Sequence, residues 1–167
     1  MIQFQKNTEA PMTIRKATIK DIPSLLSLLS QVLEVHHKGR PDLFRTGAVK
    51  YTSDELCDLL ADESRPVFVC TDEKDSVLGY CFCIMKEEKG SNILADIKTL
   101  YIDDLCVDES CRGRHVGSTL YRYALEYAKQ EGCYNVTLNV WALNDSAMEF
   151  YRRMGLSTQK IGMEQIL

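Results

Sequence analysis

The sequence lacks several features that would indicate particular classes of protein. Its 167 residues contain no apolar run long enough to cross a bilayer, and the first eleven, MIQFQKNTEAP, lack the charged start and apolar stretch of a signal peptide. The seven cysteines are an odd number, with no two pairs at zinc-finger spacing. No basic stripe stands out among 20 Lys and Arg against 24 Asp and Glu. We therefore predict a cytoplasmic protein with reduced cysteines and without a metal, a membrane or a nucleic acid as its partner.

The length and the 45% hydrophobic content suit one domain with a substantial core. We expect this domain over residues 12–167 and a loosely ordered extension over residues 1–11. Apolar patterns and turn residues predict strands over residues 12–17, 66–71, 76–86, 95–107, 134–140 and 157–167. They predict helices over residues 20–35, 116–131 and 144–155, and a further short helix that Ser53 caps. Short polar turns favour antiparallel hairpins, so the fold class is mixed α/β with one sheet.

A glycine-containing loop, residues 112–118 (RGRHVGS), lies between a predicted strand and a predicted helix. The first N–H groups of a helix are unpaired and carry partial positive charge, an arrangement that binds phosphate groups. Gly113 and Gly117 would let a ligand approach the backbone, and Arg112 and Arg114 would add charge. An ordinary surface turn is the alternative that this loop alone leaves open.

A second motif, residues 144–156 (NDSAMEFYRRMGL), predicts a short helix that Asn144 caps and Gly155 ends. Together with the loop and the strand before it, this motif resembles the GCN5-related N-acetyltransferase (GNAT) family, from about residue 12 to the C-terminus. The resemblance implies a mostly antiparallel mixed sheet, split like a V between its fourth and fifth strands and flanked by helices. One departure is His115, which stands where the loop pattern of the family has its first glycine.

The resemblance also implies acetyl-CoA as cosubstrate and no metal. The loop would hold the pyrophosphate, and the backbone of residues 105–107 would pair with the pantetheine arm as an extra strand. The implied cofactor-binding residues are Leu105, Cys106, Val107, Arg112, Gly113, Arg114, His115, Val116, Gly117, Ser118 and Asn144.

Two adjacent carboxylates, Asp103 and Asp104, interrupt an apolar strand. Neighbouring strand residues face opposite sides of a sheet unless a bulge intervenes, so one aspartate could simply face solvent while the other binds a backbone N–H or an arginine. The resemblance implies a bulge in this strand and an acidic residue at position 103 that accepts a proton from the acceptor amine. The backbone N–H groups of Cys106 and Val107 would then stabilise the oxyanion, and the catalytic residues would be Asp103, Asp104 and Tyr151.

Tyr151 has two interpretations. On sequence alone it is a core aromatic residue beside Phe150 on an amphipathic helix. Its place in the second motif implies instead that its phenol protonates the departing CoA thiolate.

The predicted reaction is acetyl transfer to a primary amine of a small molecule or a peptide. His36, His37 and Phe44 lie in a segment that the resemblance places at the acceptor site, although a solvated histidine pair at a helix end is the alternative. Two other classes of function stand beside this one, namely a non-catalytic acyl-CoA-binding module and a nucleotide-binding protein. The missing G-x-x-x-x-G-K-[ST] motif argues against the last. The resemblance also predicts a homodimer.

Overall fold

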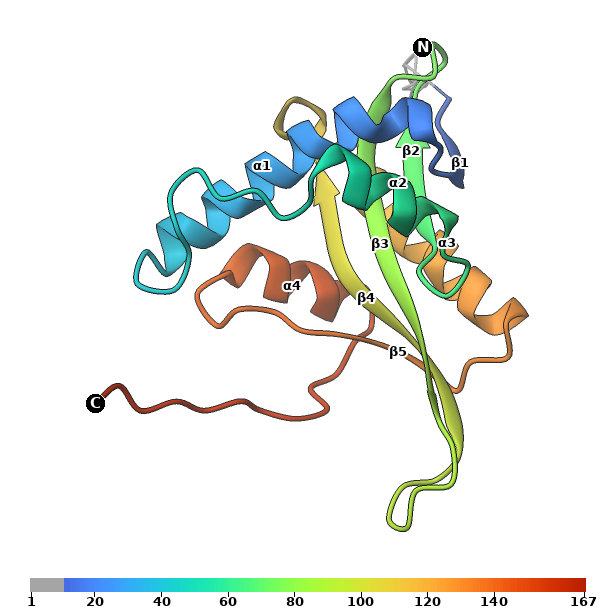
Figure 1. Ribbon diagram of the computed structural model, residues 1–167, viewed down its shortest axis with the longest axis vertical. Coiled ribbons are helices and arrows are strands. Elements are labelled where there is room, and N and C mark those ends of the chain that lie inside the picture. Colours follow the sequence, from blue (N-terminus) through green and yellow to red (C-terminus); the bar gives the residue numbers. More distant parts are fainter. Residues whose placement is uncertain (1–10) are drawn as a thin grey trace, which may run out of the picture.

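The predicted strands pair into one five-stranded sheet in the computed structural model, which describes residues 11–167 (Figure 1). The strands are β1 (Thr13–Lys16), β2 (Val67–Thr71), β3 (Val77–Glu88), β4 (Ile97–Val107) and β5 (Asn135–Leu138), in that order across the sheet. Neighbours are antiparallel except for β4 and β5, which are parallel. The predicted mixed, mostly antiparallel sheet is therefore confirmed.

The fourth and fifth strands pair over only part of their length. The paired residues run from Thr99 with Asn135 to Ile102 with Leu138. Beyond that point β4 continues to Val107 with β3 as its only neighbour among the described strands. The edge of β4 after Ile102 that would face β5 is consequently not covered by that strand.

Helices cover both faces of the sheet (Figure 1). On one face lie α1 (Ile22–Gly39) and α2 (Ser53–Ala61), and on the other lies α3 (Val116–Gln130), with α4 (Asp145–Arg153) beyond the open edge of β4. Leucines at helical spacing, such as Leu25 and Leu29, fill the core under α1, while Leu120 and Ala124 fill the core under α3. These side chains are buried between the helices and the sheet.

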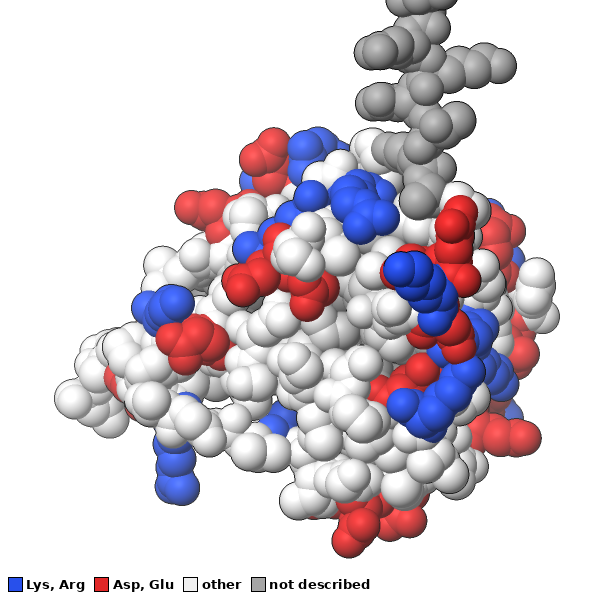
Figure 2. Space-filling view, turned by 90° about the horizontal axis from the view of Figure 1, so that it is seen from above, with Lys and Arg blue, Asp and Glu red and all other residues white. Residues whose placement is uncertain are grey.

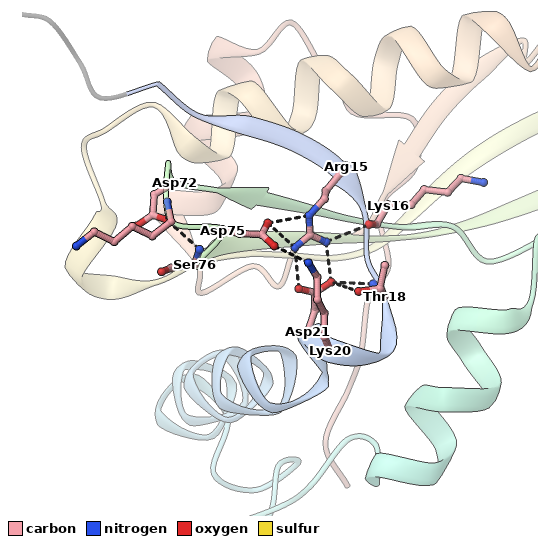
Figure 3. A network of polar contacts seen from close by, with 9 residues as sticks. Arg15, Lys16, Thr18, Lys20, Asp21, Asp72, Asp75 and Ser76 are labelled. Carbon is pink, nitrogen blue, oxygen red and sulfur yellow. Dashed lines mark hydrogen bonds and ion pairs between the residues drawn. The ribbon is translucent and has the colours of Figure 1, made fainter.

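A polar network ties β1 to the start of α1 and to the turn between β2 and β3 (Figure 3). Arg15 donates to both carboxylate oxygens of Asp21, at 2.7 and 2.9 Å, and also to Asp75. Asp21 is 3% exposed and accepts a further bond from the Thr18 N–H. The hydrogen bonds from Arg15 lower the pKa of Asp21 to about 2. The buried carboxylate is therefore ionised and paired at neutral pH.

Three of the predicted elements differ from the structure. The first helix extends to Gly39, so His36 and His37 lie in its last turn rather than in a loop. Thr52, not Ser53, is the N-cap of α2, where its hydroxyl accepts from the Glu55 N–H at 3.2 Å. The predicted strand over residues 157–167 is wrong, because this segment pairs with no described strand and most of its side chains are exposed. The predicted extension, apart from Pro11, lies outside the described residues.

Candidate active site

The two adjacent aspartates of β4 lie at a β-bulge. Phe82 on β3 pairs with Asp104, but its neighbour Cys83 pairs with Ile102, so Asp103 is the extra residue on β4. The bulge that the resemblance implied is therefore confirmed.

The bulge reverses the alternation of side chains along β4. Ile102 before it and Leu105 after it both pack into the core on the α3 face, whereas Cys106 packs into the core on the α1 face. An uninterrupted strand would place residues 102 and 105 on opposite faces. Asp103 and Asp104 consequently both face the α1 side of the sheet, where they meet the same cation.

That cation is Lys50, in the segment between α1 and α2. Its Nζ lies 2.9 Å from Oδ2 of Asp103 and 3.4 Å from Oδ2 of Asp104. Tyr80 on β3 donates its hydroxyl to the same oxygen of Asp104 at 3.2 Å. The exposed side-chain fraction is 9% for Asp104, 25% for Asp103 and 28% for Lys50. The two carboxylates therefore differ in burial although they share one partner.

Burial and charge act on these groups in opposite directions. Burial raises the pKa of Asp104, and the attraction of Lys50 and the hydroxyl of Tyr80 only partly offset this effect. Burial would lower the pKa of Lys50, but the charges of Asp104 and Asp103 outweigh it, so its pKa stands above the ordinary value. Lys50 is the more exposed partner and has two carboxylates beside it. The ammonium is therefore held charged, while Asp104 takes up a proton more readily than an exposed carboxylate.

His36 connects this acidic cluster to a group of aromatic side chains. Burial lowers the pKa of His36, an effect opposed by Asp104 and supported by Lys50, so its ring is neutral at pH 7. The ring stacks at a tilt on Phe44 at 5.0 Å, and Phe44 meets Trp141 edge-on at 5.2 Å. These side chains border a small hollow lined by Val35, His36, Gly39, Arg40, Phe44, Trp141, Leu143 and Asn144.

His37 has a different role from its neighbour. Its Nδ1 lies 2.7 Å from the carbonyl oxygen of Phe44, so this nitrogen donates, and its Nε2 forms a hydrogen bond with the hydroxyl of Thr46 at 3.0 Å. Because both ring nitrogens are engaged, His37 holds the loop after α1 in place. Of the three predicted acceptor-site residues, His36 and Phe44 come together at the hollow and His37 supports them.

The loop over residues 112–118 leads into α3 as predicted. The N-cap of α3 is His115, in the left-handed conformation with φ 61°, and its side chain makes no capping hydrogen bond to the first N–H groups of the helix. A left-handed residue is disfavoured for any side chain. The glycine that the family pattern has at this position would adopt the same conformation without strain.

The two glycines of this loop differ in their surroundings. Gly113 has φ 79° and no heavy atom within 4 Å of the place where a Cβ would stand, so it suits both the turn and a close ligand. Gly117 faces the protein instead, since a Cβ there would lie 3.3 Å from Val107 and 3.5 Å from the ring of Phe150. Gly117 therefore allows α3 to pack closely against β4 and α4. That it also lets a ligand approach the backbone stays a prediction.

The open edge of β4 presents unpaired main-chain groups. The Asp108 N–H donates to the carbonyl of Leu78 at 2.9 Å, and main-chain groups in an antiparallel pair alternate in direction. The N–H and C=O groups of Leu105 and Val107 thus point away from β3, whereas those of Cys106 point toward it. The side chain of Cys106 is buried and its Sγ lies 3.6 Å from the carbonyl of Leu28.

The second motif forms α4 as predicted. Asn144 is its N-cap, and its side chain accepts from the Ala147 N–H at 3.2 Å. Tyr151 contacts Phe150 and Tyr121 edge-on, and burial raises its pKa, as do the nearby Cys81 and Asp104.

The hydroxyl of Tyr151 has no hydrogen-bond partner among the described residues. Within residues 11–167 every buried polar side-chain atom has a hydrogen-bond partner. Because the hydroxyl of Tyr151 has none, it must be exposed to solvent. The ring therefore packs as a core aromatic while its hydroxyl stays free for a ligand.

Comparison with known proteins identifies the family. The family model described as "Acetyltransferase (GNAT) family" matches residues 30–156. The chain belongs to the GNAT acetyltransferase family. A crystal structure of a mutant BH1408 protein from Bacillus halodurans superposes on this GNAT chain with a TM-score of 0.89 and 32% identity, covering 93% of this chain and 99% of that one.

Curated relatives of this GNAT chain match over shorter stretches. An uncharacterized N-acetyltransferase, MJ1207, from Methanocaldococcus jannaschii is 40% identical over 60 residues, which cover 36% of this chain and 26% of that protein. Glucosamine 6-phosphate N-acetyltransferase from Arabidopsis thaliana is 25% identical over 99 residues, which cover 52% of this chain and 64% of that protein. The chain thus spans about a quarter of the length of MJ1207 and somewhat under two thirds of the length of the Arabidopsis enzyme.

Two side chains of the candidate site were not predicted from the sequence. Lys50 lies in a loop more than 50 positions before the aspartates that it contacts, and Tyr80 lies on the neighbouring strand. No local pattern marks either residue. Only the pairing of β3 with β4 and the path of the segment after α1 bring them to Asp104.

The charges on one face of the molecule are mixed. On the face shown in Figure 2, basic and acidic side chains are interspersed. Within residues 11–167 no helix is both long and apolar enough to span a membrane. The same residues include no group of three or more His, Cys, Asp or Glu arranged to hold a metal ion.

Proposed function

We propose that this GNAT domain, over residues 12–167, transfers the acetyl group of acetyl-CoA to a primary amine of a small molecule or a peptide. The observation that carries the proposal is the pair of carboxylates that the bulge turns to one face of β4, beside an open strand edge. Acyl transfer to an amine needs a proton acceptor next to the site that holds the acyl donor. The open edge and the bulge meet at residues 103–107.

The residues present fit acetyl-CoA, which supplies the activated acyl carbonyl. The uncapped N–H groups at the start of α3, with Arg112 and Arg114 nearby, would hold the pyrophosphate. The main-chain groups of Leu105 and Val107 would bind the pantetheine amides as an added strand. The amide nitrogen of Asn144 is left for the cosubstrate, because its carbonyl oxygen already caps α4.

The acidic cluster would take the proton from the acceptor. A primary amine is mostly protonated near neutral pH, and only the neutral amine is nucleophilic. Asp103 is the more exposed carboxylate and would meet the ammonium, while Asp104, with its raised pKa, would accept the proton. The neutral ring of His36 is a further acceptor on the same side.

Two other groups would serve the leaving thiolate and the developing oxyanion. The solvent-reaching hydroxyl of Tyr151 would donate a proton to the thiolate. The Val107 N–H, which points to the open edge, would donate to the oxyanion. The Cys106 N–H is less suited, because it points toward β3.

The test is thiol release from acetyl-CoA, measured with polyamines, amino acids, aminoglycosides and peptide N-termini as acceptors. Tyr151→Phe should lower kcat roughly 10- to 100-fold, below the upper range for general acids because a thiolate leaves readily and water can protonate it. The melting temperature and the affinity for acetyl-CoA should stay near those of the wild type, since the ring remains.

Tyr134→Phe is the matched control, because Tyr134 is 76% exposed and lies outside the site. Its kcat should equal that of the wild type. Equal kcat values for both variants would remove Tyr151 from the mechanism. Tight binding of acetyl-CoA without thiol release for any acceptor would favour the acyl-CoA-binding module instead.

The proposal extends to assembly and location. The segment 157–167 (Figure 1) carries exposed apolar side chains, with Ile161 80% and Met163 94% exposed, and its described contact with the rest of the molecule includes an ion pair between Glu164 and Arg40. We propose that a second copy covers this segment in a homodimer and that the enzyme works in the cytoplasm. Sedimentation of the full chain beside a chain ending at residue 156 tests the dimer, since the shortened chain should be monomeric.

A further inference from the structure

The place where an acceptor amine should bind already holds an amine of this chain. The Nζ of Lys50 lies 2.9 and 3.4 Å from the two carboxylates that the proposed mechanism assigns to the acceptor. Lys50 belongs to the segment between α1 and α2, most of which has no regular secondary structure. The side chain thus reaches the acidic pair from a loop, as a bound ligand would reach it from solvent.

We propose that Lys50 is itself an acetyl acceptor, so that the enzyme modifies its own acceptor site. The inference rests on the proposed function, because it uses the same acyl donor and the same carboxylates. An amine tethered beside the reacting groups has a large advantage over a free one, since its position is already restricted.

The chemical step is ordinary acyl transfer. A proton passes from the Lys50 ammonium to the carboxylate of Asp103 or Asp104. The neutral nitrogen then forms a bond to the acetyl carbonyl carbon, and the carbon–sulfur bond breaks. The sulfur leaves as a thiolate and takes up a proton, so the products are Nε-acetyl-Lys50, free CoA thiol and one proton released to solvent.

Uncatalysed acetylation would select other lysines. Lys38, Lys89 and Lys129 have side chains that are 72%, 74% and 69% exposed. Each of these three pairs with one carboxylate, whereas Lys50 is 28% exposed and pairs with two, which hold it protonated. Lys50 should therefore be among the slowest to react without catalysis. The order of reactivity therefore distinguishes transfer within the site from chemical modification.

Acetylation would change the site for later acceptors. The modified side chain is neutral, so Asp103 and Asp104 lose their counter-charge. The acceptor site becomes more negative, and a cationic amine should then bind more tightly.

The test uses the wild-type protein with acetyl-CoA and no acceptor, followed by peptide mapping in a mass spectrometer. Lys50 should gain its acetyl group at least about tenfold faster than the three exposed lysines, as expected for a positioned amine. With acetic anhydride, which needs no enzyme, the order should reverse. The slow thiol release expected from the wild type without acceptor should vanish in Lys50→Arg, because a guanidinium keeps the charge but is not acetylated.

Two results separate this inference from the proposed function. If external amines support thiol release while Lys50 reacts no faster than the exposed lysines, the inference is wrong and the proposed function stands. If neither an external amine nor Lys50 is acetylated, both are wrong. A cationic acceptor that is turned over should also slow the acetylation of Lys50, because both amines need the same carboxylates.

Discussion

The buried ion pair between Arg15 and Asp21 gives a quantitative test of the structure. The pKa of Asp21 falls from 3.8 to about 2 in the folded chain. Because one unit of pKa corresponds to about 1.4 kcal/mol, the ionised carboxylate contributes roughly 2.5 kcal/mol to the free energy of unfolding at neutral pH. Asp21→Asn should lose about that amount, since it keeps the size of the side chain and removes the charge.

The pH dependence of this loss has a definite sign. A lowered folded-state pKa gives stability that is fully present above the unfolded value of 3.8 and is lost as the pH falls toward 2. The difference between wild type and Asp21→Asn should therefore be constant from pH 5 to 7 and should shrink to about half at pH 3. Urea unfolding, followed by circular dichroism and by the fluorescence of Trp141, measures it at each pH.

Asp75→Asn is the matched control for this experiment. Asp75 also pairs with Arg15, but its side chain is 47% exposed, and exposed ion pairs contribute about 0–1 kcal/mol. It has φ 63°, a conformation that asparagine tolerates. Equal losses in the two variants, or a loss in Asp21→Asn that does not change with pH, would refute the argument from burial.

Three further predictions concern the sheet and the site. Gly79→Ala should lower the free energy of unfolding by about 1–3 kcal/mol in thermal melts, because its Cβ would stand 2.7 Å from the carbonyl oxygen of Cys106. Gly39→Ala, with no atom within 4 Å, is the control, and equal melting temperatures would contradict the packing. His115→Gly should bind acetyl-CoA with unchanged affinity in calorimetry. Its free energy of unfolding should change by no more than about 1 kcal/mol, since relief of the left-handed strain offsets the greater freedom of glycine in the unfolded chain. The rate of acetyl transfer by the wild type should fall as the pH drops through the raised pKa of Asp104. Asp104→Asn should be slow at every pH. A wild-type pH profile in this variant would exclude Asp104 as the base.

Local chemistry allowed much of the fold to be predicted from the sequence. Asn144 caps α4 because its side chain bonds a backbone N–H three residues later, within one turn of chain. The leucines of α1 mark its buried face through their spacing alone. The loop before α3 and the motif around Tyr151 are similarly continuous stretches, so their order along the chain sufficed to indicate the family.

Other features depend on packing between distant segments. Residues 157–167 have an apolar content typical of a strand, yet a strand exists only where a neighbour supplies hydrogen bonds, and none of the described strands does. Gly117 belongs to a predicted ligand loop, and only the structure shows that a side chain at this position would also meet Val107 and Phe150. The sequence at one position does not show which distant residues will pack against it.

The active site combines both kinds of information. The sequence by itself determined that two carboxylates stand side by side at positions 103 and 104, and that a strand of this kind puts them on opposite faces unless it bulges. The tertiary structure decided the bulge, through the pairing of Phe82 with Asp104 and of Cys83 with Ile102. It also brought Lys50 to both carboxylates, because ion pairs form between groups that are close in space whatever their separation along the chain.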